Sequence, residues 1–211
     1  MTTFDGETTD RLLTTTRAVR KRLDLSRPVP RDVVLDCLRV AVQAPTGGNA
    51  QRWRWVVVDD PELRGELAAL YRRMADPYLE GHRQNIGDNA VLSSSRYLAE
   101  HLHEVPVHVV PCVLDRMPAS ASNGELAGFY GSILPAVWSF MLALRSRGLG
   151  TVLTTLHLAY EREAGALLGI PETVTQVALL PVAYTIGDDF KPAARRPIEE
   201  ITYWNGWKQV G

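Results

Sequence analysis

The chain has 211 residues, with 23 lysines and arginines against 24 aspartates and glutamates, which gives a formal net charge of -1 at pH 7. This length suits one domain with an appended extension and leaves enough chain for a sizeable core. A nearly neutral chain has no long-range positive field to hold a polyanion, so general nucleic-acid binding is disfavoured. Only a local basic cluster could support it.

Cysteine usage and hydropathy exclude further classes of protein. Cys37 and Cys112 lie in apolar stretches without metal-ligand spacing, so we expect neither a disulfide scaffold nor a zinc site. The polar, acidic N-terminal residues lack the basic start and apolar run of a signal peptide. The most apolar stretch, residues 133–144, is broken by Pro135 and falls short of the ~18 residues that span a bilayer. We expect a cytoplasmic protein that does not engage a membrane.

Hydrophobic periodicity predicts helices and strands in alternation along the first half of the chain. We expect helices over residues 9–22, from Pro30 to a stop at Pro45, from Asp60 through Met74 and over 97–103, with strands over 53–58 and 107–114. Two polar segments, 75–95 and 115–124, are predicted to be loose. Loops of this length are often lids, and the sequence leaves open whether these two are lids or simply mobile loops.

The second half begins with a long predicted helix over residues 124–147, apolar on nearly every face from 133 to 144. Such a helix should run through the core or a subunit interface. A strand over 151–155, a helix over 161–168 and a strand over 176–185 follow. The tail, residues 188–211, carries large apolar groups without an obvious helix partner, namely Ile198, Ile201, Tyr203, Trp204 and Trp207. We therefore expect the tail to wrap another surface.

A basic cluster near the N-terminus is the first candidate for chemistry. Arg17, Arg20, Lys21 and Arg22 place four cations within six residues. Guanidinium groups bind phosphate bidentately, which favours a phosphate site. The same cations would also suit the solvated C-terminal end of a helix, and spacing alone does not separate the two interpretations.

Three further segments carry features of a binding site. Residues 44–53 form a small turn whose paired glycines would let backbone approach a ligand, and whose amides could meet a heteroaromatic edge. Glycines at 148 and 150 follow the long helix and also suit an ordinary C-cap. Arg195 and Arg196 bring a late basic pair that could meet the first cluster across a phosphate.

The absence of several common catalytic and nucleotide-binding motifs is equally informative. The sequence contains no GxxxxGK[ST], GxGxxG, GxSxG or HExxH pattern, so the chemistries that those motifs mark lose support. The five histidines sit in no nucleophile or metal pattern, and we interpret them as surface or packing residues. Because no acid, base or nucleophile stands out, we expect a cofactor to carry the chemistry.

Taken in order, these segments resemble the FMN-dependent nitroreductase superfamily. The family has an Arg-Arg-Ser-x-Arg-like motif, an Ala-Pro-Ser-x-x-Asn-x-Gln-Pro-Trp-like turn, a Gly-Leu-Gly-Thr helix end, a Leu-Pro-Val-Gly-Tyr-like strand and a late Arg-x-Pro. Residues 16–20, 44–53, 148–151, 180–184 and 195–197 match them in that order, over about residues 12–207. Shorter segments at 19–23, 134–140, 154–158 and 204–207 look like the mycobacterial and actinobacterial branch.

The resemblance implies an α+β fold with a central mixed, mostly antiparallel sheet flanked by helices. One nitroreductase domain would occupy residues 1–211, with a core over about 9–187 and a C-terminal extension over 188–211. It also implies a homodimer with FMN at the interface, in which each extension clasps the partner subunit.

The resemblance further implies which residues hold FMN. The phosphate would lie near Arg17, Ala18 and Arg20, with Arg195 approaching from the late motif. The ring and ribityl chain would contact Pro45, Thr46, Asn49, Gln51, Leu153, Thr154 and Thr155. The chain departs from the pattern at Thr16, Ala18, Arg52 and Ala183, where the family often has Arg, Ser, Pro and Gly, so two side-chain phosphate contacts are in doubt.

The implied activity is ping-pong transfer of hydride from NAD(P)H through FMN to a small nitroaromatic or quinone-like acceptor, with no metal and no catalytic side chain. The physiological acceptor, the choice between NADH and NADPH, and one- versus two-electron transfer stay open.

A dehalogenating or flavin-consuming enzyme of the same fold is the alternative, although residues 75–95 show no cluster assignable to either. A basic-patch nucleic-acid module is the rival from another class, and it predicts affinity that falls steeply with salt. The balanced charge and the lack of interleaved aromatics argue against it.

Overall fold

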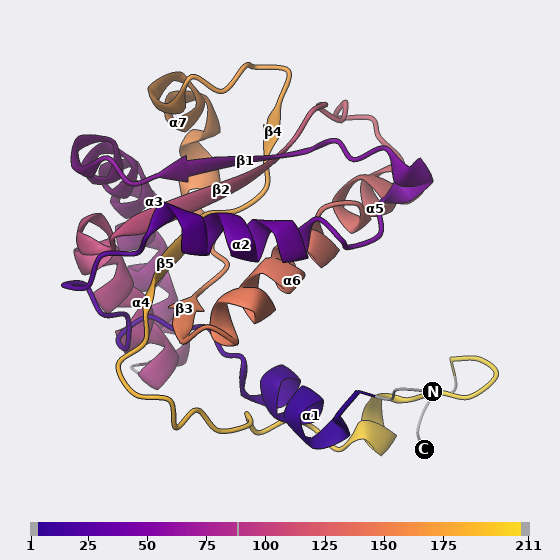
Figure 1. Ribbon diagram of the computed structural model, residues 1–211. Helices are drawn as coiled ribbons and strands as arrows, with labels where there is room; N and C mark the ends of the chain where they lie inside the picture. The colour runs from indigo at the N-terminus through magenta and orange to yellow at the C-terminus, as the bar shows by residue number, and fades with distance from the viewer. Residues whose placement is uncertain (1–3, 88, 208–211) are drawn as a thin grey trace.

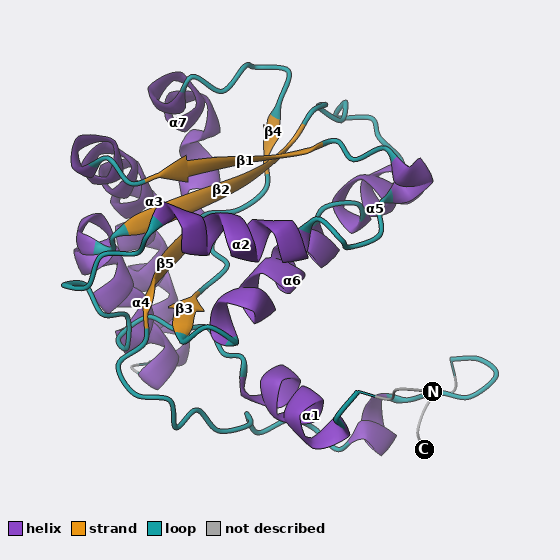
Figure 2. Ribbon diagram, in the orientation of Figure 1, coloured by secondary structure: helices purple, strands orange, loops and turns teal. Residues whose placement is uncertain are grey.

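The computed structural model describes residues 4–87 and 89–207. Its centre is a five-stranded sheet in the order β1-β2-β5-β3, with β4 pairing separately with β2. The strands are β1 (Trp53–Val58), β2 (Val107–Val113), β3 (Leu149–Thr151), β4 (Thr175–Gln176) and β5 (Leu180–Tyr184). These strands pair antiparallel, and one isolated parallel bridge joins Ala18 to Thr151. The predicted α+β fold with a mostly antiparallel sheet is confirmed (Figure 2).

Helices cover both faces of the sheet (Figure 1). On one face lie α3 (Pro61–Ile86), α4 (Ala90–His101) and α7 (Glu161–Leu168), and on the other α2 (Arg31–Ala41) and α6 (Leu134–Arg145). Successive residues of a strand point to opposite faces, so β2 serves two cores: Val110 belongs to the first and Val109 to the second. The two faces of the sheet therefore have separate apolar cores.

The first helix is shorter than predicted. α1 (Gly6–Thr15) ends where three consecutive threonines, 14 to 16, bond their hydroxyls to carbonyls four residues earlier. The predicted extension to Arg22 is wrong, because Val19 donates its N–H to the carbonyl of Thr151 at 2.9 Å and is buried. The basic cluster therefore does not form the C-terminal end of a helix, and that interpretation is wrong.

The predicted loop over residues 75–95 is also wrong, because most of it is helix. α3 continues to Ile86 through Pro77, since Tyr71, Ala75 and Leu79 are buried at helical spacing and extend its apolar face. After a short break, the side chain of Asn89 caps α4 by accepting from the N–H of Leu92 at 2.9 Å. The serines at 93–95 lie in the first turns of α4.

The predicted long helix over 124–147 is two helices. A capping box between Ser122 and Glu125 begins α5 (Asn123–Gly131), and the chain turns at Ser132 and Ile133 before α6. By length and hydropathy alone this stretch could cross a membrane. Six of the twelve α6 residues are nevertheless buried in the protein, Phe140 among them. The predicted strand over 176–185 is likewise interrupted, because Leu179 turns aside to exchange backbone hydrogen bonds with Thr154.

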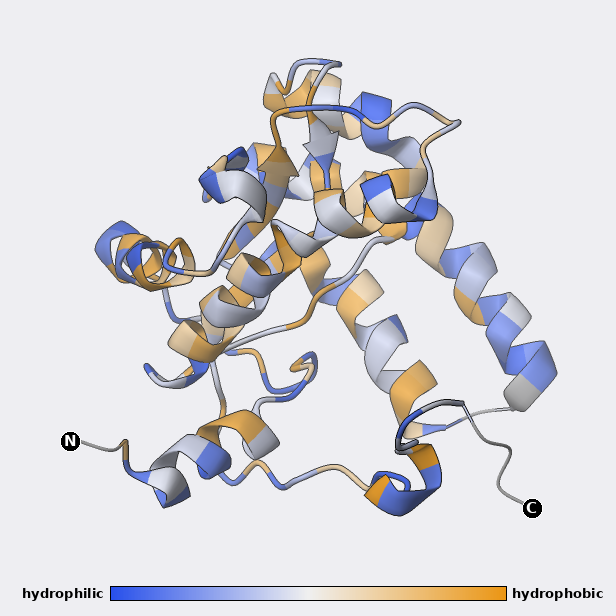
Figure 3. Ribbon diagram, turned by 90° about the vertical axis from the view of Figure 1, so that its right-hand side faces the viewer, coloured by the Kyte–Doolittle hydropathy of each residue, from blue (hydrophilic) through white to orange (hydrophobic). Residues whose placement is uncertain are grey.

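The described part of the tail runs past α1 as an arm outside the body of the molecule (Figure 3). It contains one short 3-10 helix, η4 (Ile198–Ile201). Trp204 and Trp207 are 78% and 84% exposed, and Ile198 is 63% exposed. Within one chain these apolar groups remain largely uncovered.

Candidate functional site

The basic segment at residues 17–22 runs along the edge of the sheet beside β3. Val19 and Leu23 are buried and fix its backbone, while Ala18 forms the parallel bridge to Thr151. Gly150 is required here, because an added Cβ would lie 2.7 Å from the Thr185 methyl and 3.0 Å from Val19. Close packing of backbone against backbone thus holds the cations of the segment at the sheet's edge.

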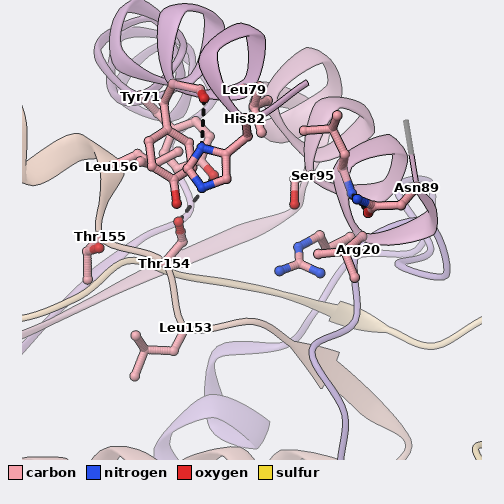
Figure 4. A pocket seen from close by; sticks show the side chains of 13 residues that line it. Arg20, Tyr71, Leu79, His82, Asn89, Ser95, Leu153, Thr154, Thr155 and Leu156 are labelled. Carbon is pink, nitrogen blue, oxygen red and sulfur yellow. Dashed lines mark hydrogen bonds between the residues drawn. The ribbon is translucent and has the colours of Figure 1, made fainter. Parts of the chain in front are cut away.

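A cavity of about 530 Å³ opens between this segment, the α3–α4 pair and the chain that follows β3 (Figure 4). Four residues assigned from the sequence line it: Arg20, Leu153, Thr154 and Thr155. The remaining lining residues come from the region expected to be a loop and its surroundings: Tyr71, Tyr78, Leu79, His82, Asn89, Val91, Leu92, Ser95 and Leu156. The cavity is therefore built mainly by helix.

Arg20 forms the basic end of the cavity. Its Nη1 lies 3.4 Å from the hydroxyl of Ser94, and partial burial lowers the pKa of its guanidinium. No ion pair joins it to a carboxylate of a described residue. A partly desolvated cation without a protein counterion is suited to an anionic ligand.

Tyr71 and Thr154 form the hydroxyl-bearing wall at the other end. The Tyr71 hydroxyl lies 3.1 Å from Oγ1 of Thr154, and burial raises the pKa of Tyr71. The phenol therefore stays neutral. Because Thr154 is also held by two backbone hydrogen bonds to Leu179, of 3.1 and 2.8 Å, this wall is attached to both α3 and the sheet.

Tyr78 and His82 lie one turn apart on α3 and face the cavity together. Their rings are 4.3 Å apart at an interplanar angle of 37°. Nδ1 of His82 lies 3.1 Å from the carbonyl oxygen of Tyr78. His82 is exposed, as expected of a surface histidine, and it also lines the cavity.

A second, shallower cavity of about 300 Å³ adjoins the first through Arg20. Arg17 and Ala18 line it together with Ser94 and residues 189–191 at the root of the tail. Arg17 donates from Nη1 to the carbonyl of Lys191 at 2.8 Å. Arg17 and Arg20 therefore border one shared cavity, although Arg17 also holds the tail.

The turn that carries Pro45, Thr46, Asn49 and Gln51 lies apart from these cavities and lines neither. It contains the 3-10 helix η1 (Gly47–Asn49), and both Asn49 and Gln51 adopt positive φ, 51° and 49°. Such backbone is uncommon for residues other than glycine and is often found at functional sites. Both amide side chains are exposed, so the turn presents them outward.

Arg195 also lies apart from both cavities. It belongs to the exposed tail, and its Nη1 donates to the neighbouring carbonyl of Ala194 at 3.0 Å. A single chain thus gathers Arg17, Ala18, Arg20 and residues 153–155, but not the 45–51 turn or Arg195.

A two-core antiparallel sheet with helices on both faces and a cavity with a basic end and a hydroxyl-bearing wall at one edge defines the α+β class of this protein. Residues 13–184 match the model of the Nitroreductase family, and the chain belongs to that family. The narrower resemblance to the mycobacterial and actinobacterial branch stays a prediction.

Relatives of known function or structure support the assignment to the Nitroreductase family. The iodotyrosine deiodinase of Thermotoga neapolitana is 28% identical over 83% of this chain and 87% of its own length. Human iodotyrosine deiodinase 1 is 28% identical over 82% of this chain, which spans 61% of the human protein. The crystal structure of an iodotyrosine deiodinase bound to FMN and 3-iodo-L-tyrosine superposes with a TM-score of 0.68 at 27% identity, covering 93% of this chain and 98% of that one. A nitroreductase-like protein from Bacillus cereus shares the fold, with a TM-score of 0.67 at 21% identity, covering 97% and 98% of the two chains.

Proposed function

We propose that the protein is an FMN-dependent oxidoreductase that takes electrons from NAD(P)H and passes them to a small nitroaromatic or quinone-like acceptor in a ping-pong cycle. The observation that carries this proposal is the cavity itself. One end holds Arg20, which forms no ion pair with a carboxylate of the described residues, and the other holds the Tyr71–Thr154 hydroxyl pair. An anionic group and a flat heteroaromatic ring fit these two ends.

The residues present suit FMN. Arg17 and Arg20 would hold the phosphate, since both border the second cavity, and guanidinium groups bind phosphate oxygens as charged donors. Ala18 carries no hydroxyl, so a family contact is missing there. The Ser94 hydroxyl, 3.4 Å from Arg20, lies close enough to replace it.

When bound, FMN supplies the hydride and electron transfer, which no side chain of this chain can perform. The chain's own residues bind and orient it. Thr154 and Thr155 would lie along the ring edge, with Thr154 held by Tyr71 and Leu179. Leu79, Leu92 and Leu156 on the cavity wall exclude water, which strengthens the polar contacts that remain.

We further propose a homodimer, because one chain leaves both the site and its apolar surface incomplete. The 45–51 turn presents Asn49 and Gln51 away from its own cavities, and a partner's copy of this turn would complete the ring side. Large apolar side chains are exposed on α5, namely Leu126 and Tyr130, and on α6, namely Leu134 and Trp138. A second copy would bury these side chains and those of the uncovered tail.

Reductive dehalogenation is the second candidate function, because deiodinases are among the relatives of this chain. Iodotyrosine is a zwitterion, and its recognition needs a cation for the carboxylate and an acceptor or carboxylate for the ammonium. Among the described lining residues Arg20 is the only permanent cation, His82 is the only other residue that can carry positive charge, and none is a carboxylate. Since Arg20 is assigned to phosphate, the cavity favours an acceptor that lacks the charged ammonium and carboxylate of an amino acid.

We expect the protein to act in the cytoplasm, on small molecules rather than nucleic acid.

The visible absorption spectrum of the purified protein, with mass spectrometry of the heat-released chromophore, tests the cofactor. FMN is expected, and FAD or no flavin after reconstitution would contradict the proposal. Anaerobic addition of NADH or NADPH should bleach the flavin, and a quinone or nitroaromatic should restore its colour. Faster restoration by 3-iodotyrosine than by either acceptor would instead support the dehalogenase.

A further inference from the structure

The five histidines fall into three environments. His108 and His157 are fully buried, and burial lowers the pKa of each to about 4. His101 and His103 lie at the end of α4 beside Glu104, outside the cavity. His82 alone lines the cavity, where it is exposed enough to exchange protons with water.

The surroundings of His82 determine which ring nitrogen can act. Nδ1 donates its proton to the carbonyl oxygen of Tyr78 at 3.1 Å, and the Tyr78 ring packs against the imidazole. The ring is therefore oriented by its own helix. Nε2 is the nitrogen that remains to take up and deliver a proton, while Nδ1 keeps its hydrogen bond in both charge states.

The other groups that face His82 are less suited to this role. The guanidinium of Arg20 does not release its proton in proteins, and the phenol of Tyr71 is already hydrogen-bonded to Thr154 at 3.1 Å, with its pKa raised by burial. The described lining residues from α4 and from 153–156 do not titrate. Glu80, on the next face of α3, is engaged by Arg83 at 2.7 Å, which helps to lower its pKa to about 2.

We propose that His82 donates the proton that completes reduction of a quinone-type acceptor. The inference rests on the proposed function, with a reduced nicotinamide as the source of electrons. A hydride equivalent, two electrons and one proton, adds to one quinone oxygen and gives the hydroquinone monoanion. The imidazolium of His82 transfers its Nε2 proton to the other oxygen, so the product leaves as neutral hydroquinone and His82 becomes neutral. Solvent then reprotonates Nε2.

His82→Gln tests this role, with His101→Gln as the matched control because His101 lies outside the cavity. Anaerobic stopped-flow measurements follow the reductive step with NAD(P)H and the oxidative step with a quinone. We expect His82→Gln to slow the oxidative step about 100-fold, the lower end of what a positioned general acid contributes. The reductive step and the His101→Gln protein should match the wild type. Oxidation by ferricyanide, which takes electrons without a proton, should be equally fast in all three proteins.

A readout independent of turnover is the imidazole ¹⁵N NMR spectrum of the oxidised protein with 4-cyanophenol, a phenol that cannot be reduced. The His82 signals should shift on binding, and the dissociation constant of 4-cyanophenol measured from the flavin absorbance should rise in His82→Gln. A wild type that is never reduced by nicotinamide would overturn the proposed function. A wild type that turns over, with quinone oxidation unchanged in His82→Gln, would overturn only the role of His82. Equal slowing with ferricyanide would do so too, since it would show general damage to the site.

Discussion

The guanidinium of Arg22 lies 4.1 Å from the centre of the Phe190 ring, and its Nη2 bonds to the carboxylate of Asp189 at 2.7 Å. Arg145 approaches the same ring at 4.7 Å, while Arg17 holds the carbonyl of Lys191. The root of the tail is therefore fastened to the basic segment that borders the candidate phosphate site. The tail root and the candidate phosphate site therefore share Arg17 and Arg22.

Phe190→Ala should loosen this attachment. Two cation–π contacts, each worth roughly 0.5–1 kcal/mol at exposed sites, would be lost. We expect faster hydrogen exchange over residues 188–201 and unchanged exchange in α3 and the sheet. Val91→Ala, an exposed apolar truncation away from the tail root, is the control. Equal exchange in the tail of wild type and Phe190→Ala would show that the arginines do not hold it.

Deleting residues 202–211 should lower dimer stability and flavin retention together. The deletion removes Tyr203, Trp204 and Trp207, and burying each large apolar side chain contributes about 1.5–3 kcal/mol. If the tail clasps a partner whose flavin lies at the same interface, both properties depend on it. Analytical ultracentrifugation and flavin absorbance measure them. A truncated protein that stays dimeric and fully yellow would rule out the clasp.

Arg195→Ala should weaken FMN binding by about 1.5–3 kcal/mol, the range for hydrogen bonds to a charged group. That is roughly a 10- to 150-fold rise in the dissociation constant. Arg196→Ala is the matched control, since only Arg195 aligns with the family's phosphate ligand. Fluorescence titration of the apoprotein with FMN measures both. Because Arg195 lies away from Arg17 and Arg20 in one chain, an unchanged affinity would mean that it never reaches the phosphate.

Elements with strong local signals could be predicted from the sequence. The β-branched and aromatic run of β1 and the helix of α7 have the predicted bounds. The non-helical course of residues 17–22, which ends in a turn at 20–22, could not, because a distant partner, the Thr151 carbonyl, imposes it on a locally helical pattern. Long-range pairing outweighs local propensity there.

The same limit applies to the cavity. The resemblance brought Arg20, Thr154 and Thr155 into the site, but Tyr71, Tyr78 and His82 were missed. Asp76-Pro77 and the polar residues around Gly81 are typical of a loop, and only one buried residue per turn, Ala75 and then Leu79, marks the continuing helix. Once α3 runs through this region, its spacing of four places Tyr78 and His82 side by side.

The two buried histidines should make stability fall with acid. Their folded-state pKa values are lowered from 6.5 to about 4, chiefly by burial, so the unfolded chain binds more protons between those values. Above about pH 6.5 the two histidines should not reduce the free energy of unfolding. As the pH falls from there toward 4, the free energy of unfolding should decrease by about 1.4 kcal/mol per pH unit for each histidine.

His157 is the histidine to replace, because both of its ring nitrogens lack a partner among the described residues, whereas His108 bonds to the Leu102 carbonyl at 2.9 Å. We expect His157→Leu to raise the stability at pH 7 by about 1–3 kcal/mol, since an unsatisfied buried polar group is removed. It should also halve the histidine part of the pH dependence, seen as the difference between the variant and wild-type curves from urea unfolding. A variant that is less stable at pH 7 and keeps the wild-type slope would mean that the imidazole of His157 has a bound partner in solution.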